Sequence, residues 1–190
     1  MIGPVSHDAL QLREGLQRTS RPVAFDVETT GLAVRTARIL SLGFRVHVDG
    51  QWRNFILFTE HCSHRSIRPY VTPWTEIRQA LVPLRRQGLT LVGHNIKFDL
   101  LMLRREGFEY RGLTRDTQSL LRLEDQDRIF TEETTGRQNL TAPPGRQWSN
   151  YKLKDAAYHL LRISPKYTPS PNMDLVPYAE HAIYLERLTE

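Results

Sequence analysis

The sequence predicts an α/β fold with a central mixed sheet of five strands flanked by helices. Length and composition are the first observation, because 190 residues, 39% of them hydrophobic, suit one domain with a sizeable core. The second is a set of apolar, β-branched runs of strand length in the first third of the chain. The third is the alternation of helical patterns with short strands that follows them.

The first half of the chain predicts one helix and three strands. Residues 6–18 have helical spacing, and Arg21-Pro22 separates them from the first strand. Asp49-Gly50 is typical of a hairpin turn between the second and third strands, so we expect an antiparallel meander. The predicted strands are residues 23–27, 39–48 and 52–58.

The second half predicts helices and short strands in alternation. Thr72 is suited to cap a helix that runs to about Arg86, with Pro73 in its tolerated first turn. The elements that follow are a strand at 89–92, a helix that continues through Leu103, a short strand near Leu113, a helix from Asp116, and helices at 151–161 and 177–188.

Residues 124–149 are polar and show no sustained period. Unstructured loops of this length are uncommon and often contact substrate, although a surface insertion is an equal alternative. We therefore expect a single domain over residues 1–190, with an N-terminal helical extension at 1–20 and a long polar loop at 124–149.

The net charge of +5 is carried mostly by arginine, and six arginines fall between residues 85 and 115. Phosphate is their natural counterpart, although arginines also solvate helix faces. No apolar run approaches the ~18 residues that span a bilayer, so we expect a soluble cytoplasmic protein with no membrane partner.

Cys62 is the single cysteine of the sequence, which excludes an internal disulfide. With His61 and His64 it offers too few ligands for a zinc site without a distant fourth one, and we favour a plain loop.

Asp26 and Glu28 are the most informative pair of residues. They end an apolar strand, and because strand side chains alternate, both project to the same face. Holding two carboxylates there costs several kcal/mol unless a cation or a donor compensates them. The pair alone could be ordinary solvated acids, so the interpretation depends on a second motif.

That motif is Gly93-His94-Asn95-Ile96-Lys97-Phe98-Asp99. It follows a short strand and opens an amphipathic helix, which places Asp99 within the first two helical turns. We expect the Asp99 carboxylate to meet the strand pair.

Two segments together resemble the first two motifs of the DEDD superfamily of 3′-to-5′ exonucleases, found in DnaQ and in the exonuclease domain of family A DNA polymerases. They are Phe25-Asp26-Val27-Glu28-Thr29-Thr30-Gly31-Leu32 and the motif that begins at Gly93. Residues 111–117 and 151–157 resemble the family A segments between the second and third motifs, so the likeness extends from about Pro22 to the C-terminus. The resemblance implies an α/β ribonuclease-H-like exonuclease fold. It also implies hydrolysis of single-stranded DNA to nucleoside monophosphates.

The resemblance further implies two Mg²⁺ or Mn²⁺ ions per site, which clamp the attacking water and the leaving oxygen. By the same resemblance Asp26 bridges both ions, Glu28 binds the inner ion and Asp99 binds the outer one. Carboxylates suit these hard cations, which prefer oxygen ligands.

Substrate contacts are implied in the same way. Asn95 lies one helical turn before Asp99 and is a candidate for bonding the 3′-terminal sugar. Leu32 matches the position where family members stack an apolar side chain on the terminal base, although it could equally be ordinary core. The other candidate substrate-binding residues are Thr29, His94 and Phe98 in the two motifs, and Arg137, Arg146 and Trp148 in the long loop.

The third motif departs from the family A pattern, Tyr-x-x-x-Asp on the last helix. Tyr178 matches the tyrosine that orients the attacking water, but Ala182 stands where the fourth carboxylate belongs. Another alignment uses His181 and Glu186 as the His-x-x-x-x-Asp of the other branch, and natural loss of catalysis is a further explanation. We favour a deliberate replacement: aspartate at 182 in the parent protein, and an inactive or impaired chain here.

The expected partners are the 3′ end of single-stranded DNA and a DNA polymerase or replication protein, bound by a monomer. Met1 and the helical start favour a free-standing enzyme over an excised proofreading domain. The alternatives are an RNA 3′-end exonuclease of the RNase D type, which shares the motifs, and a catalytically silent module that binds single-stranded nucleic acid.

Overall fold

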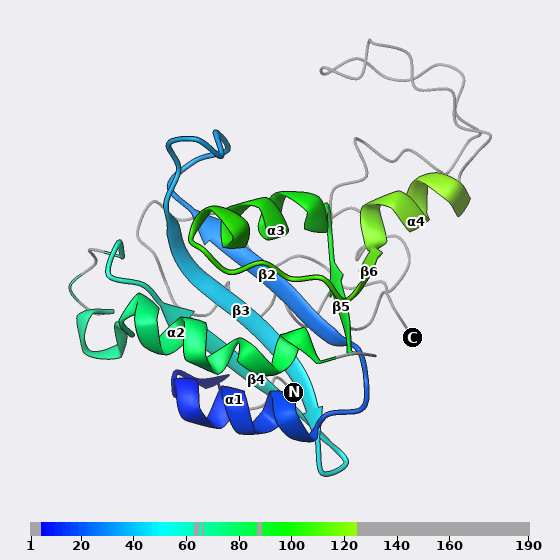
Figure 1. Ribbon diagram of the computed structural model, residues 1–190, viewed down its shortest axis with the longest axis horizontal. Coiled ribbons are helices and arrows are strands. Elements are labelled where there is room, and N and C mark those ends of the chain that lie inside the picture. Colours follow the sequence, from blue (N-terminus) through cyan, green and yellow to red (C-terminus); the bar gives the residue numbers. More distant parts are fainter. Residues whose placement is uncertain (1–4, 63–64, 66, 87–88, 125–190) are drawn as a thin grey trace, which may run out of the picture.

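The computed structural model describes residues 5–62, 65, 67–86 and 89–124, and these form a mixed six-stranded sheet with helices (Figure 1). The order of the strands is β1-β4-β3-β2-β5-β6. The strands are β1 (Val5–Ser6), β2 (Val23–Thr29), β3 (Ile39–Val48), β4 (Gln51–Phe58), β5 (Thr90–Gly93) and β6 (Leu113–Asp116). The helices are α1 (Ala9–Arg18), α2 (Trp74–Ala80), α3 (Ile96–Arg105) and α4 (Thr117–Glu124), with 3₁₀ turns η1 (Arg68–Tyr70) and η2 (Val82–Arg85).

The predicted antiparallel meander is present as β2, β3 and β4. Asp49 and Gly50 connect β3 to β4 with φ angles of 53° and 78°, the left-handed pair that a tight hairpin turn requires. On the other side of β2, β5 and β6 pair in parallel, which makes the sheet mixed as expected. The α/β fold class is thereby confirmed.

The sheet has one strand more than the five predicted. β1 is two residues long and pairs in parallel with β4, Val5 opposite Asn54 and Ser6 opposite Phe55. Its second residue, Ser6, falls in the span predicted as a helix at 6–18. The helix begins only at Ala9, because the Asp8 side chain caps it by accepting the main-chain N–H groups of Leu10 and Gln11.

The prediction of one helix over 72–86 is wrong in its capping and its length. Thr72 is buried and provides no side-chain cap; the first main-chain N–H of α2, that of Trp74, donates to the Glu60 carboxylate at 3.1 Å. α2 ends at Ala80 and continues as η2, because Pro83 has no N–H to donate to an α-helical partner.

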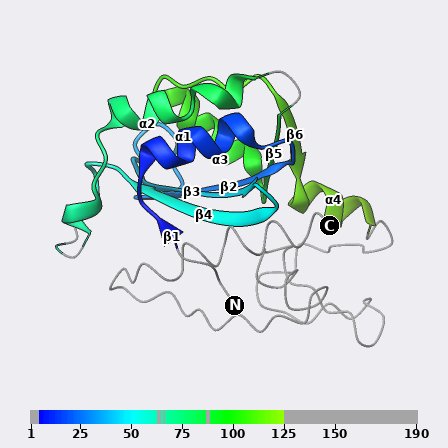
Figure 2. The same ribbon diagram turned by 90° about the horizontal axis from the view of Figure 1, so that it is seen from below.

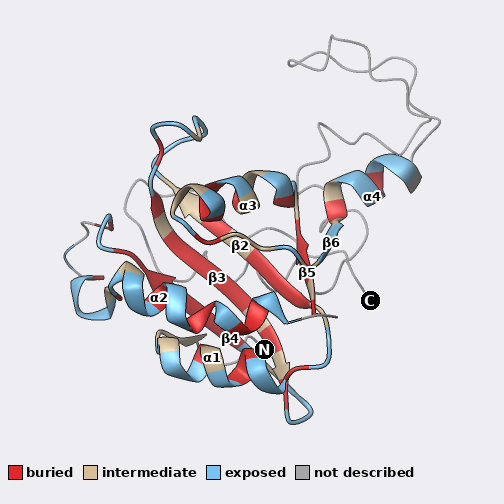
Figure 3. Cartoon of the chain, in the orientation of Figure 1, coloured by how far each residue is buried: buried red, intermediate tan, exposed pale blue. Residues whose placement is uncertain are grey.

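The core lies between the sheet and helices α1, α2 and α3, which cover the same face of the sheet (Figure 2). Buried residues run along the central strands and the inner sides of these helices (Figure 3). On β2, Phe25 and Val27 belong to this core and alternate with the half-buried Asp26 and Glu28. Among the described residues, no helix combines the length and the apolar character needed to cross a bilayer.

Candidate active site

Asp26 and Glu28 lie near the end of β2, both half-buried. In the β2–β3 register Asp26 is opposite Gly43 and Glu28 is opposite Ser41, so the neighbouring strand presents only small side chains beside the acids. The register shifts between Glu28 and Thr29, which marks the end of regular pairing. Asp26 and Glu28 therefore lie in the last regularly paired part of a buried strand.

The turn from β5 to α3 brings the second motif to the same end of the sheet. Gly93 packs so closely that a Cβ there would be 2.9 Å from the Ile96 side chain and 3.1 Å from the main-chain oxygen of Phe25. Asn95 adopts the left-handed conformation, with φ 60°, immediately before the helix. The chain therefore turns sharply at Gly93, against β2, and enters α3 with little room to spare.

Asp99 is 3% exposed, and its Oδ1 accepts the main-chain N–H of Val27 at 3.0 Å. The β2–β5 register runs through Ala24 opposite Val92, so Val27 lies beyond the part of β2 that β5 covers. The Asp99 carboxylate thus takes the place of a strand partner, and it locks α3 against the strand that carries Asp26.

The pKa of Asp99 is raised well above its ordinary value of 3.8. Burial is the main cause, the negative charge of Asp26 is the next, and the N–H of Val27 acts in the opposite direction. Asp26 and Asp99 are therefore close enough for their charges to oppose each other. A cation between such groups would remove this penalty.

The structure does not gather a complete metal site within its described part, where no three His, Cys, Asp or Glu side chains stand close enough together to hold an ion. The ligand set Asp26, Glu28 and Asp99 stays a prediction. The zinc alternative at His61 and Cys62, which the sequence disfavours, gains no support, because Cys62 is buried in an apolar cluster with Ile56, Phe58 and Ile67. His64 lies outside the described residues.

Asp116 is a residue of this site that the sequence interpretation missed. Its Oδ1 accepts the N–H groups of Asn95 at 2.9 Å, Gln118 at 2.9 Å and Ser119 at 3.4 Å. It therefore caps α4 and fixes the start of α3, and its charge adds a smaller increase to the pKa of Asp99. The capping preference for an aspartate before a predicted helix was the available signal.

His94 belongs to the same hydrogen-bonded network. The Thr117 hydroxyl donates to the main-chain oxygen of Gly93 at 3.3 Å, so the 3.0 Å contact with His94 is assigned as donation from the protonated Nδ1 of the imidazole. His94 thus joins β5 to the start of α4. Its predicted contact with substrate remains untested, as does that of Phe98, which packs against the core.

Leu32 is 86% exposed, which excludes the alternative that it is a core residue. It belongs to a loop of residues 30–38 that follows β2 directly. Thr29, predicted to bind substrate, donates its hydroxyl to the main-chain oxygen of Gly31 at 2.7 Å and shapes the turn before Leu32. Asn95 is also exposed, so both predicted substrate contacts are accessible.

Several arginines between residues 85 and 115 bind the protein's own groups. Arg86 donates to the main-chain oxygens of Gln17 and Thr19 at the end of α1. Arg85 lies over the Phe108 ring at 4.9 Å, Arg105 donates to the loop after β2, and Arg111 pairs with Glu109 at 2.7 Å. Charge counting in the sequence therefore overestimates the arginines available for phosphate.

Some of the predicted residues lie outside the described part of the chain. They are the third-motif residues Tyr178, Ala182, His181 and Glu186, and the loop residues Arg137, Arg146 and Trp148.

No family model and no curated protein matches the sequence. Solved structures do match. Brucella melitensis NrnC with bound Mg²⁺ is 18% identical, with a TM-score of 0.53 over 88% of this chain and 69% of that one. The Aedes aegypti Nibbler EXO domain is 12% identical, with a TM-score of 0.57 over 97% of this chain and 81% of that one. Escherichia coli RNase D, an exoribonuclease involved in structured RNA processing, is 15% identical, with a TM-score of 0.52 over 100% of this chain and 44% of that one.

At these identities the likeness concerns the fold. It confirms the ribonuclease-H-like exonuclease fold, and with it the resemblance to the DEDD exonucleases at the level of architecture. The family A branch remains a prediction.

Proposed function

We propose that this chain is built as a metal-dependent 3′-to-5′ exonuclease that releases nucleoside monophosphates from single-stranded DNA. One observation carries the proposal: the buried Asp99 is held by Val27 on the strand that carries Asp26, close enough for Asp26 to raise its pKa. A protein core tolerates such an arrangement poorly, and perturbed carboxylates concentrate at functional sites.

The acids fit a divalent cation in charge and in donor type. Hard cations such as Mg²⁺ and Mn²⁺ select carboxylate oxygens, and Asp26, Glu28 and Asp99 would hold them, two per site in our proposal. The ions would activate water and neutralise the charge that develops on the leaving 3′-oxygen. Within the protein, the Val27 N–H holds the Asp99 carboxylate, and Asp116 fixes the turn from which α3 begins.

Substrate binding is assigned to the exposed residues beside the acids. Leu32 offers an apolar surface for the 3′-terminal base, since stacking of this kind accepts any base, and Asn95 would bond the terminal sugar. Tyr178 would orient the attacking water. The proposed protein partner is a DNA polymerase or replication protein.

We also propose that Ala182 makes the present chain inactive or impaired. The other motif positions keep their functional residue types, and alanine provides no oxygen ligand. An impaired chain of this kind would still bind nucleic acid through the surface that surrounds the acids.

RNA is the second candidate substrate, because two of the structures with this fold bear on it. RNase D is an exoribonuclease, and NrnC was solved bound to pGG. A catalytically silent nucleic-acid-binding module is the third candidate.

One assay separates these candidates. The chain and its Ala182→Asp variant are incubated with 5′-labelled DNA and RNA oligonucleotides of the same sequence, with Mg²⁺, with Mn²⁺ or with a chelator. We expect the variant to shorten DNA stepwise from the 3′ end and the unaltered chain to bind without shortening it. Preferential shortening of RNA would select the second candidate, and binding without cleavage by both proteins would select the third.

A further inference from the structure

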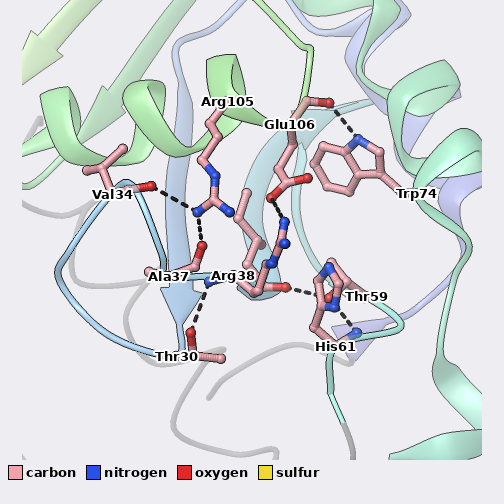
Figure 4. Close-up of polar contacts among 10 residues, drawn as sticks. Thr30, Val34, Ala37, Arg38, Thr59, His61, Trp74, Arg105 and Glu106 are labelled. Atoms are coloured by element: carbon pink, nitrogen blue, oxygen red, sulfur yellow. Dashed lines mark hydrogen bonds and ion pairs between the residues drawn. The ribbon is translucent and has the colours of Figure 1, made fainter.

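Arg105 connects the helix of Asp99 to the loop of Leu32. It is the last residue of α3, and its half-buried side chain reaches across to residues 30–38 (Figure 4). Its Nη1 donates to the main-chain oxygen of Val34 at 2.8 Å and also to that of Ala37. One guanidinium thus fixes two carbonyl groups of the loop.

The loop of residues 30–38 is also closed on itself. Its ends meet where the Thr30 N–H donates to the Arg38 oxygen at 3.0 Å and the Arg38 N–H donates to the Thr30 hydroxyl at 2.9 Å. Within the loop, the N–H groups of Thr36 and Ala37 donate to the Ala33 oxygen at 2.9 and 2.8 Å. Closed ends and a clamped middle give this exposed loop a defined shape.

A second, weaker connection lies beside the first. The Arg38 guanidinium is 3.9 Å from the Glu106 carboxylate, and the main-chain oxygen of Glu106 accepts the Trp74 indole N–H at 2.8 Å (Figure 4). The end of α3 is therefore held by α2 on one side while it holds the loop on the other.

We propose that Arg105 is a positioning residue that fixes Leu32 relative to Asp99 and so sets where the terminal base of the substrate lies. The inference rests on the proposed exonuclease function. A large apolar side chain that is 86% exposed gains from contacting a base only if the loop holds it in place, because ordering a mobile loop on binding costs affinity. Because α3 carries both Asp99 and Arg105, the base contact and the acid site become one rigid unit.

Amide hydrogen exchange tests the clamp without requiring activity. The Arg105→Met variant keeps the apolar stem and loses both donated bonds, so exchange at Thr36 and Ala37 should quicken by at least about tenfold, the lower end of the effect of one lost charged hydrogen bond. Arg105→Lys keeps the positive charge but has a compact ammonium in place of the planar guanidinium, so its exchange rates should lie between those of the unaltered chain and those of Arg105→Met. Arg104→Met, at the exposed neighbouring position, is the matched control and should leave exchange unchanged. Equal exchange in the Arg105→Met and Arg104→Met variants would overturn the proposal.

A double-mutant cycle then tests the link to substrate. The probe is an oligonucleotide with 2-aminopurine at its 3′ end, bound in Ca²⁺ to avoid cleavage. Leu32→Ala and Arg105→Met should each weaken binding and reduce the fluorescence change, and the double variant should lose no more than the worse single variant, because both act on one contact. Additive losses would show that Arg105 does not act through Leu32.

The two experiments keep the proposals distinguishable. If the unaltered chain binds the probe but Arg105→Met binds equally well with the same fluorescence change, the Arg105 proposal fails and the exonuclease proposal stands. If the unaltered chain binds no oligonucleotide, the proposed function fails and the role of Arg105 in substrate positioning fails with it.

Discussion

The Asp99 carboxylate accepts the main-chain N–H of Val27 at 3.0 Å, although the two residues are 72 positions apart in the sequence. The bond satisfies an N–H beyond the part of β2 that β5 covers, and it places a buried negative charge beside Asp26. The same contact thus serves folding, by closing α3 onto the sheet, and leaves an electrostatic penalty that a cation would relieve.

Replacing this buried charge should stabilise the metal-free protein. The native pKa of Asp99 is raised, so the folded state binds its proton more tightly than the unfolded state does. The free energy of unfolding therefore falls as pH rises from about the ordinary pKa, 3.8, through the raised native pKa, and stays low above it. Asp99→Asn keeps an oxygen for the Val27 N–H and should lose this decline.

The measurement is the unfolding temperature of both proteins across this pH range in a chelator. At pH 7 the variant should melt higher, by roughly 2–4 °C for each ~1 kcal/mol gained. Adding Mg²⁺ should raise the unfolding temperature of the unaltered chain more than that of the variant, which keeps Asp26 and Glu28 but lacks the third carboxylate. Identical pH slopes in the two proteins would contradict the assignment of this charge to Asp99.

Gly93→Ala should destabilise the protein. A Cβ at this position would lie 2.9 Å from the Ile96 side chain and 3.1 Å from the Phe25 main-chain oxygen, so β5 and α3 would have to separate. Overpacking of this kind costs about 1–3 kcal/mol, measurable as a lower urea midpoint. Gly31→Ala is the control, since a Cβ there meets no atom within 4 Å. If both variants have the same urea midpoint as the unaltered chain, the close packing at Gly93 does not constrain the residue at this position.

Asp116 should contribute to the stability of the fold mainly as a hydrogen-bond acceptor and less through its charge. Asp116→Ala removes the acceptor for Asn95, Gln118 and Ser119 and should cost about 1–2 kcal/mol, as lost helix caps do. Asp116→Asn keeps the acceptor oxygen and should lose much less. Thermal unfolding compares the two, and an equal loss in both variants would show that the charge is what matters.

Binding of single-stranded nucleic acid should fall with salt and vary little with sequence. The net charge is +5, and base stacking on an apolar side chain does not distinguish bases. Fluorescence anisotropy with oligonucleotides of different sequence at several salt concentrations measures both properties. Tight binding of one sequence that survives high salt would show base-specific recognition instead.

The fold was predictable where the side-chain pattern repeats. Alternation identified the meander, and Asp49-Gly50 identified its hairpin, because a tight turn needs left-handed backbone. β1 was not predictable from the sequence, because two residues are too few to show a strand period. The strand forms through its pairing with β4. The helix predicted over 72–86 ends at Ala80, because Pro83 lacks the N–H that a further α-helical turn needs, although the helical spacing of the side chains continues.

The sequence proposed the acids of the site, whose role as metal ligands stays a prediction, but it did not reveal the residues that support them. Same-face spacing gave Asp26 and Glu28, and the helical motif gave Asp99. The roles of Asp116 and Arg105 depend on main-chain groups far away in the sequence, Asn95 for one and Val34 for the other. A count of arginines cannot show that a guanidinium binds the protein's own carbonyl groups rather than phosphate.

The most direct test of the exonuclease account is the release of mononucleotides from a 3′-labelled single-stranded DNA by the Ala182→Asp protein, with and without the additional Asp99→Asn change. The account predicts Mg²⁺-dependent release of the terminal nucleoside monophosphate by the Ala182→Asp protein, and a rate lower by orders of magnitude when Asp99→Asn is added. Equal rates from the two proteins, or release that persists in a chelator, would contradict it.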